Sequence, residues 1–367
     1  MLMVVKRPDA EHSRKVLRMQ RALPRLLISL AMCVAGTGIF ILADLPLPFL
    51  FGPLIASLIA ALAGMPVTGP GKLGVMMRTI LGVAIGASIT PELIERLPQM
   101  AISVALVPIY VVTVAFIGVP FFRRVYGLDK PTAFFAAMPG GLQEMTTFGQ
   151  ESGANVRTLT LIHATRLLVI ILIVPVIMVV GFEADLDKPI GAPAATQPIH
   201  EMFIMLGAAL VGWQVFQRLG LFGAAIIGPM VVAAVLSLGG LITSRPPAEA
   251  ILAAQFFIGM GLGTGYVGVT LSELRKDVLA GLIYVVIVAA VAVIFAEMVI
   301  LGGLAPALEG FLAFTPAGQA EMAILAIVVG ADLGFVVLHH VVRLFFILIF
   351  SPIAARALGF SDMNKGR

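Results

Sequence analysis

The stretch MPGGLQEMTTFGQESGANVRTLTLIHATRLLVI, residues Met138–Ile170, is a polar interruption in a chain that is otherwise strongly apolar. It begins with a Pro-Gly-Gly break at 139–141 and carries Glu144 directly after that break. His163 and Arg166 then follow inside a hydrophobic run. Ionisable side chains are costly in an apolar environment and often mark function there. Their presence has to be explained by the rest of the chain.

The composition is that of a membrane protein. Of the 367 residues, 60% are hydrophobic and only 12% are charged, and the mean hydropathy is +1.06, whereas soluble domains carry roughly 25% charged residues. A spanning helix needs about 20 apolar residues, and a helix satisfies its own backbone groups in lipid. The chain has six long runs without any charge: Leu26–Ala43, Pro46–Val67, Leu97–Phe122, Leu219–Ser244, Ala250–Ser272 and Val278–Ala296. The sequence therefore predicts an all-α polytopic membrane protein embedded in a lipid bilayer.

The polar block occurs twice. Residues 138–145, MPGGLQEM, align with residues 315–322, TPAGQAEM, and the alignment continues without a gap at an offset of 177 residues. Two apolar segments can resemble each other by chance, but chance does not align the residues that are rare in such a chain. The aligned pairs include Pro139 with Pro316, Gly141 with Gly318, Glu144 with Glu321, Asn155 with Asp332, His163 with His340, Arg166 with Arg343, and Gly82 and Gly86 with Gly259 and Gly263. We interpret residues 23–181 and 200–356 as two homologous halves.

The duplicated Pro-Gly-Gly-x-x-Glu-Met block, followed by His-x-x-Arg on a hydrophobic helix, resembles the AbrB duplication family of bacterial membrane proteins. The resemblance extends from about Pro24 to Ala355. The second block departs from the motif at Ala317, where the first block has Gly140. Names given to members of this family include AbrB family transcriptional regulator and ammonia monooxygenase. The resemblance implies no established biochemical activity.

Each half contains five apolar segments and one polar-tipped segment, at 132–150 and 310–329. If the polar-tipped segments enter the membrane without crossing it, each half has five spans. The second half is then inverted relative to the first, as in many secondary transporters. If they cross fully, each half has six spans and the halves are parallel. The expected spans are 26–43, 47–64, 73–90, 98–122, 156–180, 201–218, 221–242, 250–270, 278–301 and 332–355.

The distribution of Lys and Arg favours the inverted layout, because basic residues concentrate in cytoplasmic loops. In that layout the external loops hold only three basic residues: Arg96, Lys188 and Arg245. The sequence therefore predicts a multi-pass protein of the cell inner (plasma) membrane with both termini in the cytoplasm. Three segments flank or join the halves: a basic amino-terminal tail at 1–22, an external loop at 182–199 and a carboxyl-terminal tail at 357–367.

The polar residues of the two blocks are candidates for a solute or ion pathway: Pro139, Gly140, Gly141, Glu144, His163 and Arg166 in the first half, and Pro316, Gly318, Glu321, His340 and Arg343 in the second. A broken membrane helix frees backbone groups and is tolerated only where it is buried in protein or lines water. The histidine and arginine of each half are three residues apart, so they share one helix face. A glutamate of either half is the expected partner of each arginine, and the Glu and His residues are the candidate proton carriers.

The same residues also have structural interpretations. A glutamate in the first turn of a helix is favoured by the helix dipole, and an Arg–Glu pair can serve only to pin the broken segment. Asn155 and Asp332 precede helices and are expected to cap them. The glycine pairs at 82/86 and 259/263 are typical of closely packed membrane helices.

The sequence favours an ion- or proton-coupled secondary transporter of a small solute, with its site between the two halves. The alternative is a membrane sensor that affects gene expression indirectly, without contact to nucleic acid. A monooxygenase is a remote alternative, because the five histidines form no cluster suited to copper: His12, His163, His200, His339 and His340. We expect no enzyme activity, no cofactor and no metal site, and homo-oligomerisation stays open.

Overall fold

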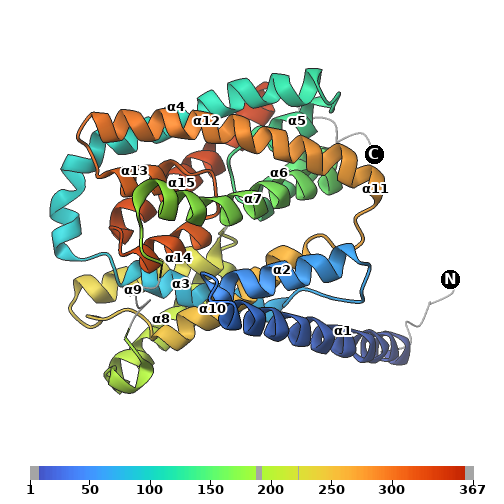
Figure 1. Ribbon diagram of the computed structural model, residues 1–367, viewed down its shortest axis with the longest axis horizontal. Coiled ribbons are helices and arrows are strands. Elements are labelled where there is room, and N and C mark those ends of the chain that lie inside the picture. Colours follow the sequence, from blue (N-terminus) through green and yellow to red (C-terminus); the bar gives the residue numbers. More distant parts are fainter. Residues whose placement is uncertain (1–7, 187–191, 222, 360–367) are drawn as a thin grey trace, which may run out of the picture. The chain divides into compact units, whose positions relative to one another are not determined.

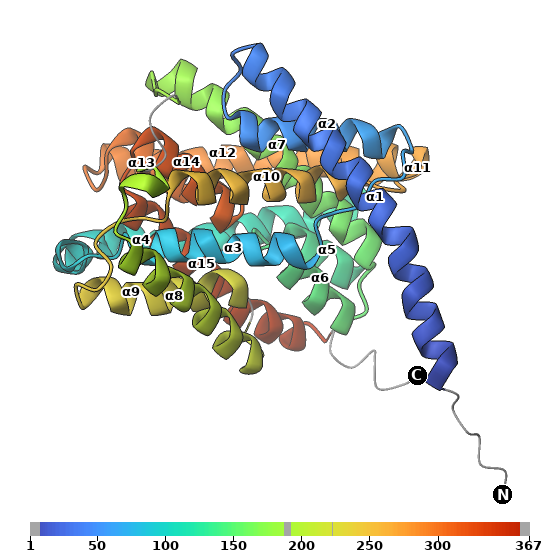
Figure 2. The same cartoon turned by 90° about the horizontal axis from the view of Figure 1, so that it is seen from below.

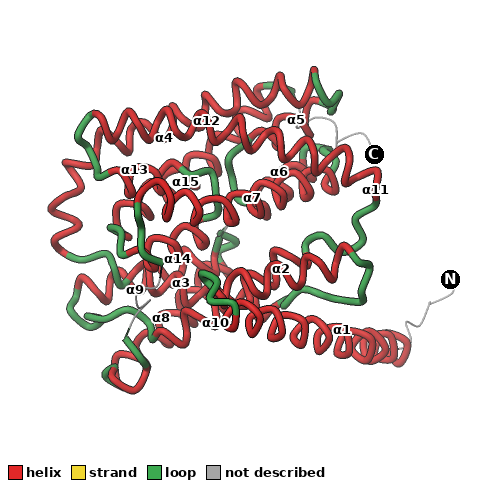
Figure 3. Tube along the Cα trace, in the orientation of Figure 1, coloured by secondary structure: helices red, strands yellow, loops and turns green. Residues whose placement is uncertain are grey.

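The computed structural model describes residues 8–186, 192–221 and 223–359. Within these ranges every regular element is helical, and Figure 3 shows the helices joined by turns and loops. The prediction of an all-α fold is confirmed. Parts of the predicted tails and of the external loop, including Lys188, lie outside the described residues. The described chain is already helical from Pro8, within the segment expected to be a tail.

The helices follow the same order of lengths in both halves: long, short, short, long, broken, long. The first half contains α1 (Pro8–Leu42), α2 (Pro48–Leu62), α3 (Lys72–Gly86), α4 (Pro91–Arg124), α5 (Lys130–Ala137), α6 (Leu142–Glu151) and α7 (Val156–Phe182). A short 3-10 turn, η1 (Ala194–Thr196), follows. The second half contains α8 (Ile199–Arg218), α9 (Ala224–Leu238), α10 (Ala248–Thr264), α11 (Leu271–Glu273), a π-helical turn η2 (Leu274–Val278), α12 (Leu279–Leu301), α13 (Ala307–Phe314), α14 (Gln319–Val329) and α15 (Leu333–Ala357).

Six helices in the described part of the chain are long and apolar enough to cross a membrane: Leu23–Leu42, Leu93–Arg124, Val156–Phe182, Ile199–Arg218, Leu271–Leu301 and Leu333–Ala357. The other four expected spans are helical but shorter, at 15 residues for α2, α3 and α9 and 17 for α10. A 15-residue helix is about 22 Å long, against a hydrocarbon core of about 30 Å. The expectation of ten full spans is corrected in this respect. Left-handed Gly64 and Gly240 lie just past α2 and α9, inside the apolar runs, where such a residue favours an early helix end.

The chain forms two compact units, one made of residues 1–74 and 256–268 and the other of residues 75–255 and 269–367. In the first unit, Gly36 of α1 lies directly against the backbone of Gly52 in α2. The hydroxyl of Ser57 donates to the carbonyl oxygen of Pro53 at 2.6 Å within α2. The second unit carries both polar blocks and therefore all the candidate site residues.

Glycines allow the short helices to pack closely. A Cβ atom at Gly82 or Gly86 of α3, or at Gly259 or Gly263 of α10, would collide with a backbone carbonyl of a neighbouring helix. The prediction of close packing at these glycines is confirmed. The carbonyls belong to Ile226 and Met230 of α9 for the first pair, and to Leu50 and Leu54 of α2 for the second. Figure 2 also shows α8 and α9 side by side, where Gly212 meets the backbone of Gly228.

Helices α4 and α12 lie along one another and run in opposite directions (Figure 1). Tyr110 of α4 packs against Phe295 of α12 with ring centroids 5.5 Å apart. Phe122, later in α4, packs against Tyr284, earlier in α12, at 4.6 Å. The sequence alignment makes α4 and α12 counterparts, so these two matching helices are antiparallel.

Candidate functional site

Each polar block folds as two short helices separated by an extended break. In the first block, α5 ends at Ala137 and α6 begins at Leu142. In the second, α13 ends at Phe314 and α14 begins at Gln319. Proline is the second residue of each break and disfavours a helical conformation in the residue before it. Met138 and Thr315, which precede the prolines, accordingly have ψ angles of 131° and 127°.

An arginine from the following long helix binds each break. Arg166 of α7 donates to the carbonyl oxygen of Met138 at 3.0 Å and also to that of Gly140. Arg343 of α15 donates to Thr315 at 2.9 Å and also to Ala317. A break leaves these carbonyls without helical partners, and a buried carbonyl without a partner is costly. The two guanidinium groups, which are 1% and 6% exposed, replace the lost helical hydrogen bonds.

A histidine one turn earlier holds the helix that precedes each break. Nε2 of His163 lies 3.0 Å from the carbonyl oxygen of Phe135, and Nε2 of His340 lies 2.9 Å from that of Leu312. Donation to a carbonyl requires the proton to be on Nε2. Nδ1 of both rings has no hydrogen-bond partner among the described residues. The arginine and histidine thus bind the break and the preceding helix in the same way in both halves.

The two glutamates occupy the first turn of the helices that follow the breaks, as expected from the sequence. Each carboxylate folds back over the glycine that caps its own helix, so a Cβ at Gly141 would meet Glu144 Oε2, and one at Gly318 would meet Glu321 Oε2. A carboxylate in this place is stabilised by the positive end of the helix dipole. Glycine at both caps leaves the room that this arrangement needs.

The glutamates differ in the charges around them. Glu144 interacts electrostatically with Arg78 of α3 and with Glu321. Glu321 interacts with both buried arginines, Arg166 and Arg343. The charges at the two breaks therefore interact across the halves, and the buried arginines interact with Glu321.

The expected contact between a glutamate and an arginine does not form. The ion pairs within the described ranges are Arg96 with Asp332 and Arg157 with Glu273. The guanidinium groups of Arg166 and Arg343 are bound to carbonyl oxygens instead, because each break presents two such acceptors side by side. Asn155 and Asp332 cap α7 and α15 as predicted, accepting from Thr158 N at 3.1 Å and from Phe335 N at 3.0 Å.

Sequence reasoning missed Tyr284. Its hydroxyl donates to the carbonyl oxygen of Ala137, the last residue of α5, at 2.6 Å. Gly118 of α4 makes room for the ring, since a Cβ there would collide with it. Tyr284 lies in an uninterrupted apolar segment, and its counterpart at the 177-residue offset is Val107. Neither the polarity pattern nor the duplication could therefore have identified it.

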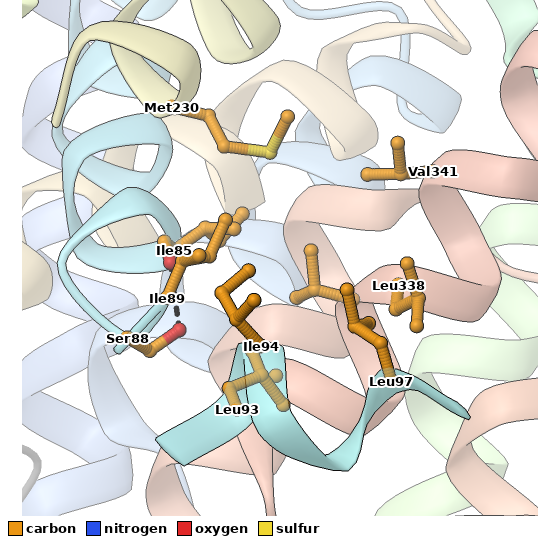
Figure 4. A pocket seen from close by; sticks show the side chains of 11 residues that line it. Ile85, Ser88, Ile89, Leu93, Ile94, Leu97, Met230, Leu338 and Val341 are labelled. Atoms are coloured by element: carbon orange, nitrogen blue, oxygen red, sulfur yellow. Dashed lines mark hydrogen bonds between the residues drawn. The ribbon is translucent and has the colours of Figure 1, made fainter. Parts of the chain in front are cut away.

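A cavity of about 140 Å³ lies between α3, α4, α9 and α15 (Figure 4). The hydroxyl of Ser88 in its wall donates to the carbonyl of Ile85 at 2.6 Å, which leaves an almost wholly apolar lining. Met230 joins the cavity to the second break, because its sulfur lies 3.8 Å from Nε2 of Gln319, the first residue of α14. The lining residues are Ile85, Ser88, Ile89, Leu93, Ile94, Leu97, Met230, Gly334, Val337, Leu338 and Val341.

In the residues that the structure describes, no group of three or more His, Cys, Asp and Glu side chains is placed to hold a metal ion. What the site offers is two carboxylates, the buried one of Glu321 and the partly buried one of Glu144, each at the start of a half-length helix and next to backbone that is fixed by arginine and histidine.

Comparison with known proteins places this arrangement in a family. Residues 49–359 match the family described as "Transition state regulatory protein AbrB". The chain is 26% identical over 357 residues to "Uncharacterized protein YhjN" of Bacillus subtilis (strain 168), covering 88% of this chain and 90% of that protein. It is also 26% identical over 331 residues to "Putative regulator AbrB" of Escherichia coli (strain K12), covering 86% of this chain and 91% of that protein. The protein belongs to the AbrB family of helical membrane-type proteins.

Proposed function

We propose that this protein is a secondary transporter of a small solute in the cell inner membrane, driven by an ion or proton gradient, and that its pathway passes between the two broken helices. The observation that carries the proposal is the matched pair of breaks, each with a glutamate at the start of the second helical piece. Irregular backbone at membrane depth is tolerated where it is enclosed by protein or lines a solute pathway.

The direction of the matching helices supports the proposal. Counterparts α4 and α12 run antiparallel, as the aromatic pairs between them require. Antiparallel counterparts are what an inverted repeat produces, and inverted repeats with discontinuous helices at their interface are common in secondary transporters. Together with the distribution of basic residues, this arrangement supports the proposal that both termini lie in the cytoplasm.

Glu144 and Glu321 are the better candidates for the coupling group. Nε2 of each histidine lies within hydrogen-bond distance of a backbone carbonyl, so the histidines fix the position of the helix before each break. The carboxylates make no ion pair among the described residues and interact with each other's charge. A change in the charge of one glutamate therefore acts directly on the other, as coupled binding of a proton and a solute requires.

The test begins with metabolite profiles of cells with and without the gene, because the solute is unknown. Solutes whose distribution changes are then measured as flux into proteoliposomes with and without a pH or ion gradient. Glu144→Gln and Glu321→Gln should abolish gradient-driven flux, whereas Glu183→Gln, at the far end of α7, should retain it. Unchanged flux in both site variants would overturn the assignment of the pathway.

The alternative function is a membrane sensor that acts on gene expression through a partner. The description of the family and the name of the E. coli relative favour it. A sensor binds its signal without moving it across the membrane. Binding of an identified solute by purified protein, together with an absence of flux in sealed vesicles, would therefore favour the sensor.

A further inference from the structure

Two ion pairs join the halves of the molecule. Nη1 of Arg96, near the start of α4, lies 2.9 Å from Oδ2 of Asp332, the residue that caps α15. Nε of Arg157, near the start of α7, lies 2.8 Å from Oε1 of Glu273 in α11. Each pair connects a helix of residues 23–181 to a helix of residues 200–356, so each must break if the halves move apart at that point.

The ion pairs occupy equivalent positions with their charges exchanged. At the 177-residue offset, Arg96 corresponds to Glu273. Asp332 corresponds to Asn155, the cap of α7, and Arg157 lies two residues after that cap. In both places a charged residue at the start of the long fourth helical segment of one half (α4 or α11–α12) pairs with a residue at the start of the last helix of the other half. One contact is therefore the counterpart of the other.

The ion pairs lie at opposite ends of the helix pair α4 and α12. Arg96 lies near the start of α4 and Phe122 near its end. Phe122 packs against Tyr284, which lies on the far side of η2 from Glu273. Because the two helices are antiparallel, Arg96 and Glu273 lie at opposite ends of the helix pair.

The surroundings of the two ion pairs differ. The apolar cavity is lined by Leu93 and Leu97 of α4, on either side of Arg96 in sequence, and by Gly334 of α15, two residues after Asp332. Beneath the other ion pair, the hydroxyl of Thr158 donates to the carboxylate of Asp277 at 3.2 Å. The structure thus has an apolar cavity next to the Arg96–Asp332 pair and a polar contact between helices next to the Arg157–Glu273 pair.

We propose that Arg96–Asp332 and Arg157–Glu273 are the two gates of the transport pathway, at opposite faces of the membrane, and that they open alternately. This inference rests on the proposed transport function. The side chains of the ion pairs are 24–55% exposed, and exposed ion pairs contribute little to stability. They can therefore break and re-form in each cycle. Arg96 and Arg157 are positioning residues that set which face is closed.

The test measures accessibility at each end and needs no known solute. Cys33, which is fully buried, is replaced by Ala. A reporter is then introduced as Ser88→Cys in the cavity wall or as Thr160→Cys below Arg157. An impermeant maleimide is applied to right-side-out and to inverted vesicles. Arg275→Gln is the matched control, because Arg275 is an exposed cation two residues from Glu273 and makes no ion pair in the described structure.

Arg96→Gln should increase labelling of the Ser88→Cys reporter and decrease labelling of the Thr160→Cys reporter. The increase should reach up to about fivefold, because an exposed ion pair can shift the equilibrium between the two states by about that factor. Arg157→Gln should do the reverse, and Arg96→Lys should behave like the unaltered chain. A parallel increase at both reporters, no change at either, or the same effect from Arg275→Gln would overturn the proposal. Flux in proteoliposomes tests the transport function separately. If the two reporters change in opposite directions but no flux is measured, the alternate opening holds and the transport function fails.

Discussion

Arg166 donates a hydrogen bond to the carbonyl oxygen of Met138 at 3.0 Å, across 28 residues of chain. The carbonyl lies at the point where α5 has ended, and the guanidinium group is almost completely buried. A side chain of α7 therefore completes the backbone hydrogen bonding of a helix that is broken inside the protein. The same relationship recurs in the second half between Arg343 and Thr315.

Removal of either arginine should strongly destabilise the protein. Arg166→Ala leaves two buried carbonyls without donors, at about 1–3 kcal/mol each, and Arg343→Ala should have a similar effect. Arg166→Lys should recover only part of the loss, because an ammonium group lacks the planar fork of donors. Thermal unfolding of the detergent-purified protein measures these differences. Arg124→Ala, at the exposed end of α4, is the control; equal stability of the control and Arg166→Ala would contradict the prediction.

Glu321 should be coupled to Arg166 more strongly than Glu144 is, although Glu144 belongs to the same half as Arg166. The charges of Glu321 and Arg166 interact, whereas Glu144 interacts with Arg78 and Glu321. Double-mutant cycles with Glu→Gln and Arg→Ala should give an interaction energy below about 0.5 kcal/mol for Glu144 with Arg166 and a larger one for Glu321 with Arg166. A reversed order would mean that the charges are arranged differently in the membrane.

Alanine at the capping glycines should displace the glutamates. The backbone of Gly141 has φ −68° and ψ 150°, which any residue can adopt, so the harm of Gly141→Ala comes from collision with the Glu144 carboxylate. Combining it with Glu144→Ala should therefore restore much of the lost stability in thermal unfolding. Gly38→Ala, where the added Cβ meets nothing within 4 Å, is the control and should be neutral or slightly stabilising. Failure of Glu144→Ala to rescue would point to another cause.

The loop between the halves should lie outside the cytoplasm. With Cys33 replaced by Ala, an exposed cysteine introduced as Ala195→Cys should react with an impermeant maleimide in right-side-out vesicles. Val125→Cys, in the turn after α4 and 67% exposed, should react only in inverted vesicles. The opposite pattern, or labelling of both positions from one side, would refute the inverted layout.

The sequence identified much of the fold and of the site because the rare residues in an apolar chain are informative. The Pro-Gly breaks and the capping Asn155 and Asp332 act through local backbone geometry, and the packing glycines act through the absence of a side chain. Residue type specifies both properties. The partners of Arg166 and Arg343 were not foreseen, because they are backbone carbonyls, which every residue has and no residue type signals. Helix length was overestimated for α2 and α9 because their apolar runs continue through Gly64 and Gly240, where the helices have already ended.

The arginine and histidine contacts that fix each break are made within one half, between residues 26–28 positions apart. The arginine and histidine contacts of the first break can therefore form during synthesis, before the second half exists, whereas the hydrogen bond from Tyr284 to Ala137 has to wait for the second half. If the two halves arose by duplication, an ancestral gene for a single half would have encoded these arginine and histidine contacts, and two copies would have supplied both breaks. Fusion of such copies would then have freed residues such as Tyr284 to diverge, since a contact between halves needs to be made only once.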